Sequence, residues 1–186
     1  MNMSKFDGQV RNLGEIPHEL LDPLISRIRD AEHLWVVGDS RFVKTLDDSR
    51  HIVLSFPDRY PDNHYPASFT EHWPEWKPLV EPVIDLVRER YGFTDAGLAK
   101  IMFSALNARA CVPLHVDTNL SSRVPHKVHV PLITDSSVHF VIDGTRHHLA
   151  LGQAYEINNL LPHSVENGSD HARVHLIFEI YQKAPV

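Results

Sequence analysis

The spacing of hydrophobic residues predicts helices in the first half of the chain. In 19–32 and again in 75–91, apolar residues recur every three or four positions, which is typical of a helix with one buried face. Gly92 follows the second segment and is a natural helix stop. Short β-branched and aromatic runs at 34–37 and 51–56 predict two strands between these helices. The first half is therefore expected to be mainly helical.

From residue 100 onward the pattern changes to short strands separated by turns. The predicted strands span 100–106, 110–116, 127–134, 138–142, 145–151, 154–158, 164–167 and 173–182. Asp143 and Gly144 lie between two of them and predict a tight hairpin turn. Roughly eight short strands at about ten-residue spacing are typical of a closed or double-sheet β architecture such as a jelly roll. We expect a mainly β protein with flanking helices.

No internal repeat or low-complexity segment divides the chain, so we expect a single domain over residues 1–186. Within it, 1–99 forms a helical and loop part that packs on the barrel, and 100–182 forms the β core with the functional site. Residues 57–74 form a long loop that contains four prolines and several aromatic residues. Because such loops commonly exclude water from an active site, we favour a lid over a packing element.

Composition narrows the function classes. The chain has 186 residues with 42% hydrophobic and 23% charged side chains, the proportions of an ordinary globular domain. No apolar run approaches the roughly 20 residues of a membrane helix, and residues 1–10 lack the apolar core of a secretory signal. A net charge of −6 argues against nucleic acid as a partner. The single cysteine, Cys111, points to a reducing compartment, so we expect a cytoplasmic protein without a membrane partner.

The 14 histidines suggest a metal site, because nine of them lie between His115 and His175. His115 and Asp117 are two positions apart on a predicted strand, so their side chains share a face and can reach one ion. A third ligand from a distant strand would complete a facial triad of two histidines and one carboxylate, which is diagnostic of non-haem Fe(II) oxygenases. His163 is the candidate for that third ligand.

Arg173 is a candidate anion-binding residue because it lies on an apolar terminal strand, ten residues after His163. A buried guanidinium needs an anionic partner, and a carboxylate of a small diacid suits its two-pronged geometry. The alternative is a structural ion pair with Glu179 or Glu156. Cys111 is expected to be a small buried hydrophobe on the face of His115, and His175 shares the face of Arg173. Weaker candidates for a substrate clamp are Arg41 and Arg123.

These residues together resemble a known family. Residues 101–178 are similar to the aspartyl/asparaginyl β-hydroxylase family of Fe(II)/2-oxoglutarate-dependent dioxygenases. The segments that carry the resemblance, in order, are Phe103-Ser104, His115-Val116-Asp117, Lys127-Val128-His129-Val130-Pro131-Leu132, His163-Ser164-Val165-Glu166-Asn167 and Arg173-Val174-His175-Leu176. Two departures are visible: Asp117 completes the triad that some members lack, and Lys127 occupies the position where arginine is usual.

The resemblance implies a double-stranded β-helix and a set of site residues. His115, Asp117 and His163 would hold Fe(II). Arg173 with Ser104 would bind one carboxylate of the co-substrate 2-oxoglutarate, and His129 with Lys127 would approach its other end. The implied activity is hydroxylation of an unactivated C–H bond. The implied substrate is a small molecule or a peptide, namely a free amino acid or a residue within a peptide. This activity consumes O2 and releases succinate and CO2.

Two other function classes stay open. One is a non-catalytic, cupin-like module that binds or senses a metal. The other is a cupin metalloenzyme, such as an isomerase or hydrolase, that uses the same ligands without 2-oxoglutarate. A zinc hydrolase would have no need of Arg173. Because the first half of the chain adds no obvious peptide-binding module, we expect a small substrate or a short peptide.

Overall fold

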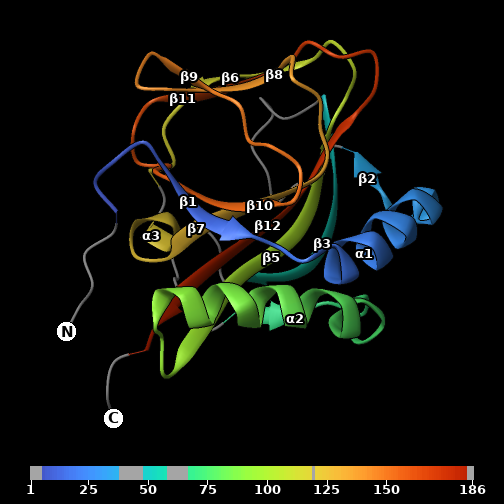
Figure 1. Cartoon of the computed structure of the whole chain (residues 1–186), viewed down its shortest axis with the longest axis vertical. Coiled ribbons are helices and arrows are strands. Elements are labelled where there is room, and N and C mark those ends of the chain that lie inside the picture. The colour runs from blue at the N-terminus through green and yellow to red at the C-terminus, as the bar shows by residue number, and fades with distance from the viewer. Residues whose placement is uncertain (1–5, 38–47, 58–66, 119, 184–186) are drawn as a thin grey trace.

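The computed structural model describes residues 6–37, 48–57, 67–118 and 120–183, and it folds them into two antiparallel β-sheets that face each other (Figure 1). The large sheet has the order β1-β10-β7-β12-β5-β3-β2, with β4 paired to β3, and the small sheet has the order β6-β11-β8-β9. This is the jelly-roll architecture that the sequence predicts.

The large sheet contains β1 (Val10–Glu15), β2 (Val36–Val37), β3 (Ser49–Pro57), β4 (Ala67–Phe69), β5 (Ala96–Leu106), β7 (His126–Ile133), β10 (Gln153–Ile157) and β12 (Arg173–Gln182). The small sheet contains β6 (Cys111–His115), β8 (Val138–Ile142), β9 (Thr145–His147) and β11 (His163–Asn167). The helices are α1 (His18–Asp30), α2 (Trp73–Tyr91) and α3 (Leu120–Arg123), with a 3-10 turn at Glu32–Leu34.

Helices α1 and α2 cover the outer face of the large sheet (Figure 1). Their apolar faces and the outward-facing residues of β3, β5, β7 and β12 form the main hydrophobic core. The fully buried Trp76 of α2 packs on Phe103 of β5, with ring centroids 4.6 Å apart. Gly92 ends α2 in the left-handed conformation, at φ 69°, which glycine adopts without steric cost.

The inner face of the large sheet carries polar residues in register. Residues opposite each other on antiparallel strands point to the same side of a sheet. His175 of β12 faces Ser104 of β5, which in turn faces His51 of β3. Farther along β12, Glu179 lies between Lys100 of β5 and Lys127 of β7. The opposite face of these strands packs in the main hydrophobic core. The polar and charged residues therefore point into the space between the two sheets.

A bulge in β6 changes which side chains face inward. His163 of β11 pairs with His115 of β6, and Val165 of β11 pairs with Val112 of β6. The step between these pairs is two residues along β11 but three residues along β6, so β6 has one extra residue there. The prediction that Cys111 is buried on the face of His115 assumed an unbroken strand and is wrong, because Cys111 is exposed.

A buried carboxylate ties the first strand to the rest of the fold. Glu156 of β10 accepts hydrogen bonds from Arg11 of β1, Tyr91 of α2 and His126 of β7. Burial raises the pKa of Glu156, but the hydrogen bond and charge of His126 and the charge of Arg11 outweigh it and lower the pKa. The carboxylate is therefore ionised at neutral pH and joins three segments that are distant in sequence.

The N-terminal part contributes more β-structure than the sequence predicts. Strand β1 was not expected, and both β1 and β3 belong to the large sheet, so the β core is not confined to 100–182. The predicted strand 145–151 ends at His147. Within the predicted loop 57–74, residues 58–66 lie outside the described residues, and the remainder includes β4 and the start of α2. Within the described ranges, no helix combines the length and apolar character of a membrane span.

Candidate active site

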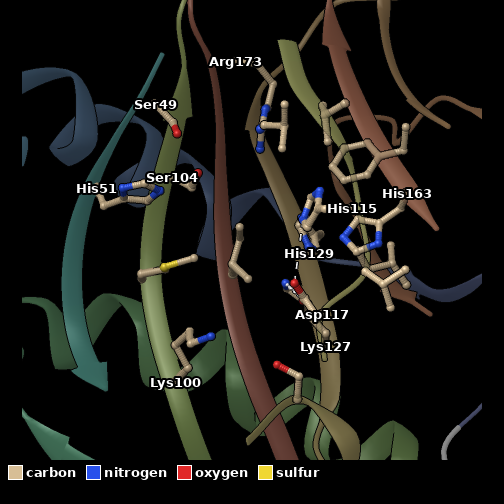
Figure 2. A pocket seen from close by; sticks show the side chains of 18 of the residues that line it. Ser49, His51, Lys100, Ser104, His115, Asp117, Lys127, His129, His163 and Arg173 are labelled. Atoms are coloured by element: carbon tan, nitrogen blue, oxygen red, sulfur yellow. Dashed lines mark hydrogen bonds and ion pairs between the residues drawn. The ribbon is translucent and has the colours of Figure 1, made fainter. Parts of the chain in front are cut away.

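A cavity of about 390 Å³ lies between the two sheets. Its walls come from β3, β5, β7, β10 and β12 of the large sheet, from β6, β8 and β11 of the small sheet, and from α3 and residues 116–118. Figure 2 shows Arg173 at one end of this pocket and Lys100 at the other, with His115, Asp117 and His163 beside its middle. All seven residues that the sequence assigned to metal or co-substrate line the cavity: Ser104, His115, Asp117, Lys127, His129, His163 and Arg173.

His115, Asp117 and His163 form a cluster that can hold one metal ion. Their ligand atoms all lie within 4.8 Å of one another. The bulge and the pairing of β6 with β11 place the two histidines side by side, with ring centroids 4.2 Å apart. Asp117 lies two residues beyond His115, and its Oδ1 is 3.7 Å from His115 Nε2. Two imidazoles and one carboxylate are the donors of a facial triad.

Backbone carbonyls orient both histidines of the cluster. Nδ1 of His115 lies 2.8 Å from the carbonyl oxygen of Pro113, and Nδ1 of His163 lies 2.9 Å from that of Leu161. A carbonyl only accepts hydrogen bonds, so each Nδ1 carries a proton, and Nε2 is the ring nitrogen that is left to face an ion. Burial and the nearby Lys127 charge lower the pKa of His163 to about 4, so this ring is neutral at neutral pH.

The carboxylate of Asp117 is held from one side by two donors. Lys127 Nζ donates to Oδ2 over 2.7 Å, and Asn159 Nδ2 donates to the same oxygen over 2.9 Å. The backbone N–H of Asp117 also donates to the Asn159 carbonyl, over 3.1 Å. Burial raises the pKa of Asp117, but the Lys127 ammonium and the Asn159 amide bring it far below its usual range. The ionised carboxylate therefore presents Oδ1 toward the histidines.

The contact with Asp117 (Figure 2) gives Lys127 a partner that the sequence did not predict. Lys127 lines the cavity, as expected for a residue that approaches the co-substrate, and its ammonium also pairs with Asp117. That approach stays a prediction. Sequence reasoning missed Asn159 altogether. It lies 42 residues from Asp117 in a turn after β10, and no local pattern marks such a contact.

Arg173 is buried and has no ion pair with any residue in the described ranges. Its side chain is only 3% exposed, and its Nε and Nη1 have no hydrogen-bond partner in the described part of the chain. The alternative prediction, a structural ion pair of Arg173 with Glu179 or Glu156, is wrong. Glu179 pairs with Lys100 over 3.1 Å, and Glu156 pairs with Arg11 and His126. Burial lowers the pKa of Arg173 to about 10, so the guanidinium stays charged at neutral pH. A buried, charged fork at the cavity wall fits a carboxylate ligand.

His129 and His175 lie beside Arg173 on the inner face of the large sheet. Their Nδ1 atoms are 3.3 Å apart, and the Nε2 of each ring lacks a partner among the described residues. Phe140 of β8 packs against both rings, and the Arg173 guanidinium lies 5.8 Å from its centroid. The expectation that His175 shares a face with Arg173 is confirmed. Of the weaker candidates, Arg123 is exposed and Arg41 lies outside the described residues.

The fold places the protein among the double-stranded β-helix proteins. It is similar to an oxidoreductase of the 2OG-Fe(II) oxygenase family from Burkholderia pseudomallei, with a TM-score of 0.62 and 11% identity over 86% of this chain and 78% of that one. It is also similar to a prolyl hydroxylase from Trichoplax adhaerens, solved with a hypoxia inducible factor oxygen degradation domain peptide fragment. That match has a TM-score of 0.60 and 10% identity over 93% of this chain and 82% of that one. A Pseudomonas putida prolyl-4-hydroxylase matches with a TM-score of 0.54 and 12% identity, over 95% and 94% of the two chains.

The sequence itself identifies the family. The family model described as aspartyl/asparaginyl β-hydroxylase matches residues 64–183, more than half of the chain, and the chain therefore belongs to this family. No curated protein sequence matches it. Membership confirms the resemblance stated from the motifs, and with it the expected class: an oxygenase that uses Fe(II), 2-oxoglutarate and O2.

Proposed function

We propose that this enzyme hydroxylates an unactivated C–H bond of an amino acid, or of a residue in a peptide, and releases succinate and CO2. The observation that carries the proposal is the buried guanidinium of Arg173 in the same cavity as the cluster of His115, Asp117 and His163. A zinc hydrolase would have no need of such a cation. Binding of a diacid with one end near the metal would use both features.

The donor set supports a specific division of roles. His115 Nε2, His163 Nε2 and Asp117 Oδ1 hold Fe(II), because these are the atoms that internal hydrogen bonds leave available. Arg173 with Ser104 would bind the distal carboxylate of 2-oxoglutarate, and His129 would donate to its other end. When bound, Fe(II) and 2-oxoglutarate supply the O2 chemistry, in which one oxygen atom enters succinate and the other enters the product.

The chain's own residues prepare the cavity for this chemistry. Lys127 offsets the charge of Asp117, so the cavity with its metal carries a positive charge that favours a dianionic co-substrate. Phe140, Ile177 and Met102 supply apolar walls that limit access of water. A peptide substrate gains support from the similar fold of the Trichoplax adhaerens enzyme, which was solved with a peptide. The lone Cys111, which is exposed, favours the cytoplasm as the site of action.

The test is an anaerobic titration of the metal-free protein with Fe(II) and then with 2-oxoglutarate, followed by the visible charge-transfer absorption of the chelated co-substrate. We expect the band to appear in the wild type and to require a much higher 2-oxoglutarate concentration in Arg173→Met. Arg146→Met, which removes an exposed arginine paired with Glu166, is the matched control and should behave as wild type. Iron binding without the band would refute the co-substrate assignment.

Substrate is then sought by succinate release in air, with free amino acids and short peptides offered in turn. Asp117→Ala and His163→Ala should abolish both iron binding and succinate release. Unchanged turnover in either variant would contradict the assigned metal ligands.

A further inference from the structure

The buried histidine pair behind the co-substrate site has a fixed arrangement. The side chain of His175 is fully buried, and its Nδ1 faces the Nδ1 of His129 over 3.3 Å. Phe140 lies nearly parallel to the His175 ring, at 12°, and nearly perpendicular to the His129 ring, at 81°. Packing from the small sheet therefore limits rotation of both rings, and the contact between the two Nδ1 atoms is a built feature of the cavity wall.

The protons on this pair are coupled. Burial, together with the charges of Lys127 and Arg173 on His129 and of Arg173 on His175, holds the pKa of each histidine well below its usual value. Both rings are thus neutral at neutral pH, and a neutral imidazole has one N–H and one lone pair. A hydrogen bond between two Nδ1 atoms requires that one carry a proton and the other not. The tautomer of His175 therefore dictates the tautomer of His129.

Only two arrangements of the protons satisfy this condition, and they differ in whether His129 Nε2 carries a lone pair or a proton. If His129 donates from Nδ1, its Nε2 presents a lone pair to the cavity, and His175 keeps a buried N–H at Nε2. The Nε2 atoms of both rings lack a partner in the part of the chain that the structure describes, but of the two residues it is His129 that lines the cavity, where a ligand can supply an acceptor. A buried donor that stays without a partner costs about 1–3 kcal/mol. If His175 donates instead, its Nε2 is a lone pair in the positive field of Arg173, and His129 presents an N–H to the cavity.

We propose that His175 is a positioning residue that donates from Nδ1 to His129 and so holds His129 in the tautomer with its proton on Nε2. The inference builds on the proposed function, because the acceptor for that N–H is a carboxylate oxygen of 2-oxoglutarate. His129 is then a preorganised hydrogen-bond donor, because its hydrogen bond with the buried His175 fixes which ring nitrogen carries the proton.

The direct test reads the tautomers without metal or co-substrate. Long-range ¹H–¹⁵N correlation spectra of the ¹⁵N-labelled metal-free protein at pH 7.5 distinguish a proton on Nδ1 from one on Nε2. His129→Gln and His175→Asn spectra assign the two rings. We expect a proton on Nε2 for His129 and on Nδ1 for His175. A proton on Nδ1 of His129 would overturn the proposal.

A second test asks whether the pair matters for binding. Nδ2 of asparagine replaces the Nδ1 donor of histidine, whereas leucine provides none. With Fe(II) bound anaerobically, we expect His175→Leu to bind 2-oxoglutarate about tenfold more weakly, the loss of one net hydrogen bond. His175→Asn should restore most of the affinity, and His171→Leu, at an exposed histidine, should match wild type. A merely structural role would not distinguish the two His175 variants in this way.

Three results separate the possible failures. Equal 2-oxoglutarate affinity in wild type and His175→Leu would overturn the positioning role even with the expected tautomers. If His175→Leu does not fold, weak binding by His175→Asn despite a retained fold would do the same. Failure of the wild type to bind 2-oxoglutarate would overturn the proposed function, while the spectra would still decide the tautomers of the pair.

Discussion

The side-chain amide of Asn159 should govern how tightly the site binds a divalent metal. Replacement of Asn159 by leucine removes the 2.9 Å hydrogen bond to Asp117 Oδ2 but keeps the backbone contact between the two residues. Hydrogen bonds to a charged group contribute about 1.5–3 kcal/mol, which corresponds to roughly a 10- to 150-fold change in affinity. A loss of 10- to 100-fold is also the usual effect of losing a group that orients a metal ligand.

The assay is calorimetric titration of the metal-free protein with Co(II), an oxygen-stable substitute for Fe(II). Asn158→Ala is the matched control, because Asn158 lies in the same turn and bonds to Phe6 and Leu160 rather than to Asp117. We expect Asn159→Leu to bind Co(II) at least tenfold more weakly and the control to bind it as wild type does. Wild-type affinity in a folded Asn159→Leu protein would refute the view that Asp117 must be held through Oδ2.

Three further predictions concern stability and reactivity. Lys100→Met leaves the buried Glu179 charge without its ion pair and should lower the free energy of unfolding, measured by urea denaturation, by about 3–5 kcal/mol. Lys183→Met removes an exposed ion pair and should change the free energy of unfolding by less than about 1 kcal/mol. Equal effects of the two variants would contradict this reasoning. The pKa values of His129 and His175 are lower in the folded protein than in the unfolded chain, so the unfolded chain takes up their protons first as pH falls below about 6.5. The free energy of unfolding of the metal-free protein should therefore fall by about 1.4 kcal/mol per pH unit for each histidine. A flat stability profile between pH 7 and 5.5 would be inconsistent with buried neutral rings. The exposed Cys111 should react with a thiol reagent while the protein is folded, and protection until denaturation would contradict its exposure.

Periodicity was sufficient to predict both long helices and most strands of the β core. It failed where tertiary pairing decides the structure. Strand β1 contains Gly14 at φ 102° and only half-buried or exposed residues, so it has no clear alternation, and it forms because it pairs with β10. Segment 145–151 has strand-like residues, but the small sheet ends at β9, so its second half has no partner strand.

The candidate site was predictable to the extent that its motifs are local. Close spacing in the sequence brought Asp117, just beyond the end of β6, to His115, and spacing along β12 placed His175 on the face of Arg173. The contacts that tune these groups join distant segments. Asn159 reaches Asp117 across 42 residues, and the bulge that turns His115 inward depends on its pairing with β11. Neither the bulge nor the Asn159 contact has a sequence period, so spacing alone cannot reveal them.

The boundary of the family match is not a boundary of the folding unit. A chain cut to residues 64–183 would lose β1 and β3 and leave long open edges on β10 and β5, which are sites for pairing with other chains. It would also remove Arg11 and leave the buried Glu156 carboxylate with fewer donors. The segments that carry the family resemblance would all be present in such a fragment, yet we expect it to aggregate. The N-terminal strands are thus a condition for solubility of the site rather than an addition to it.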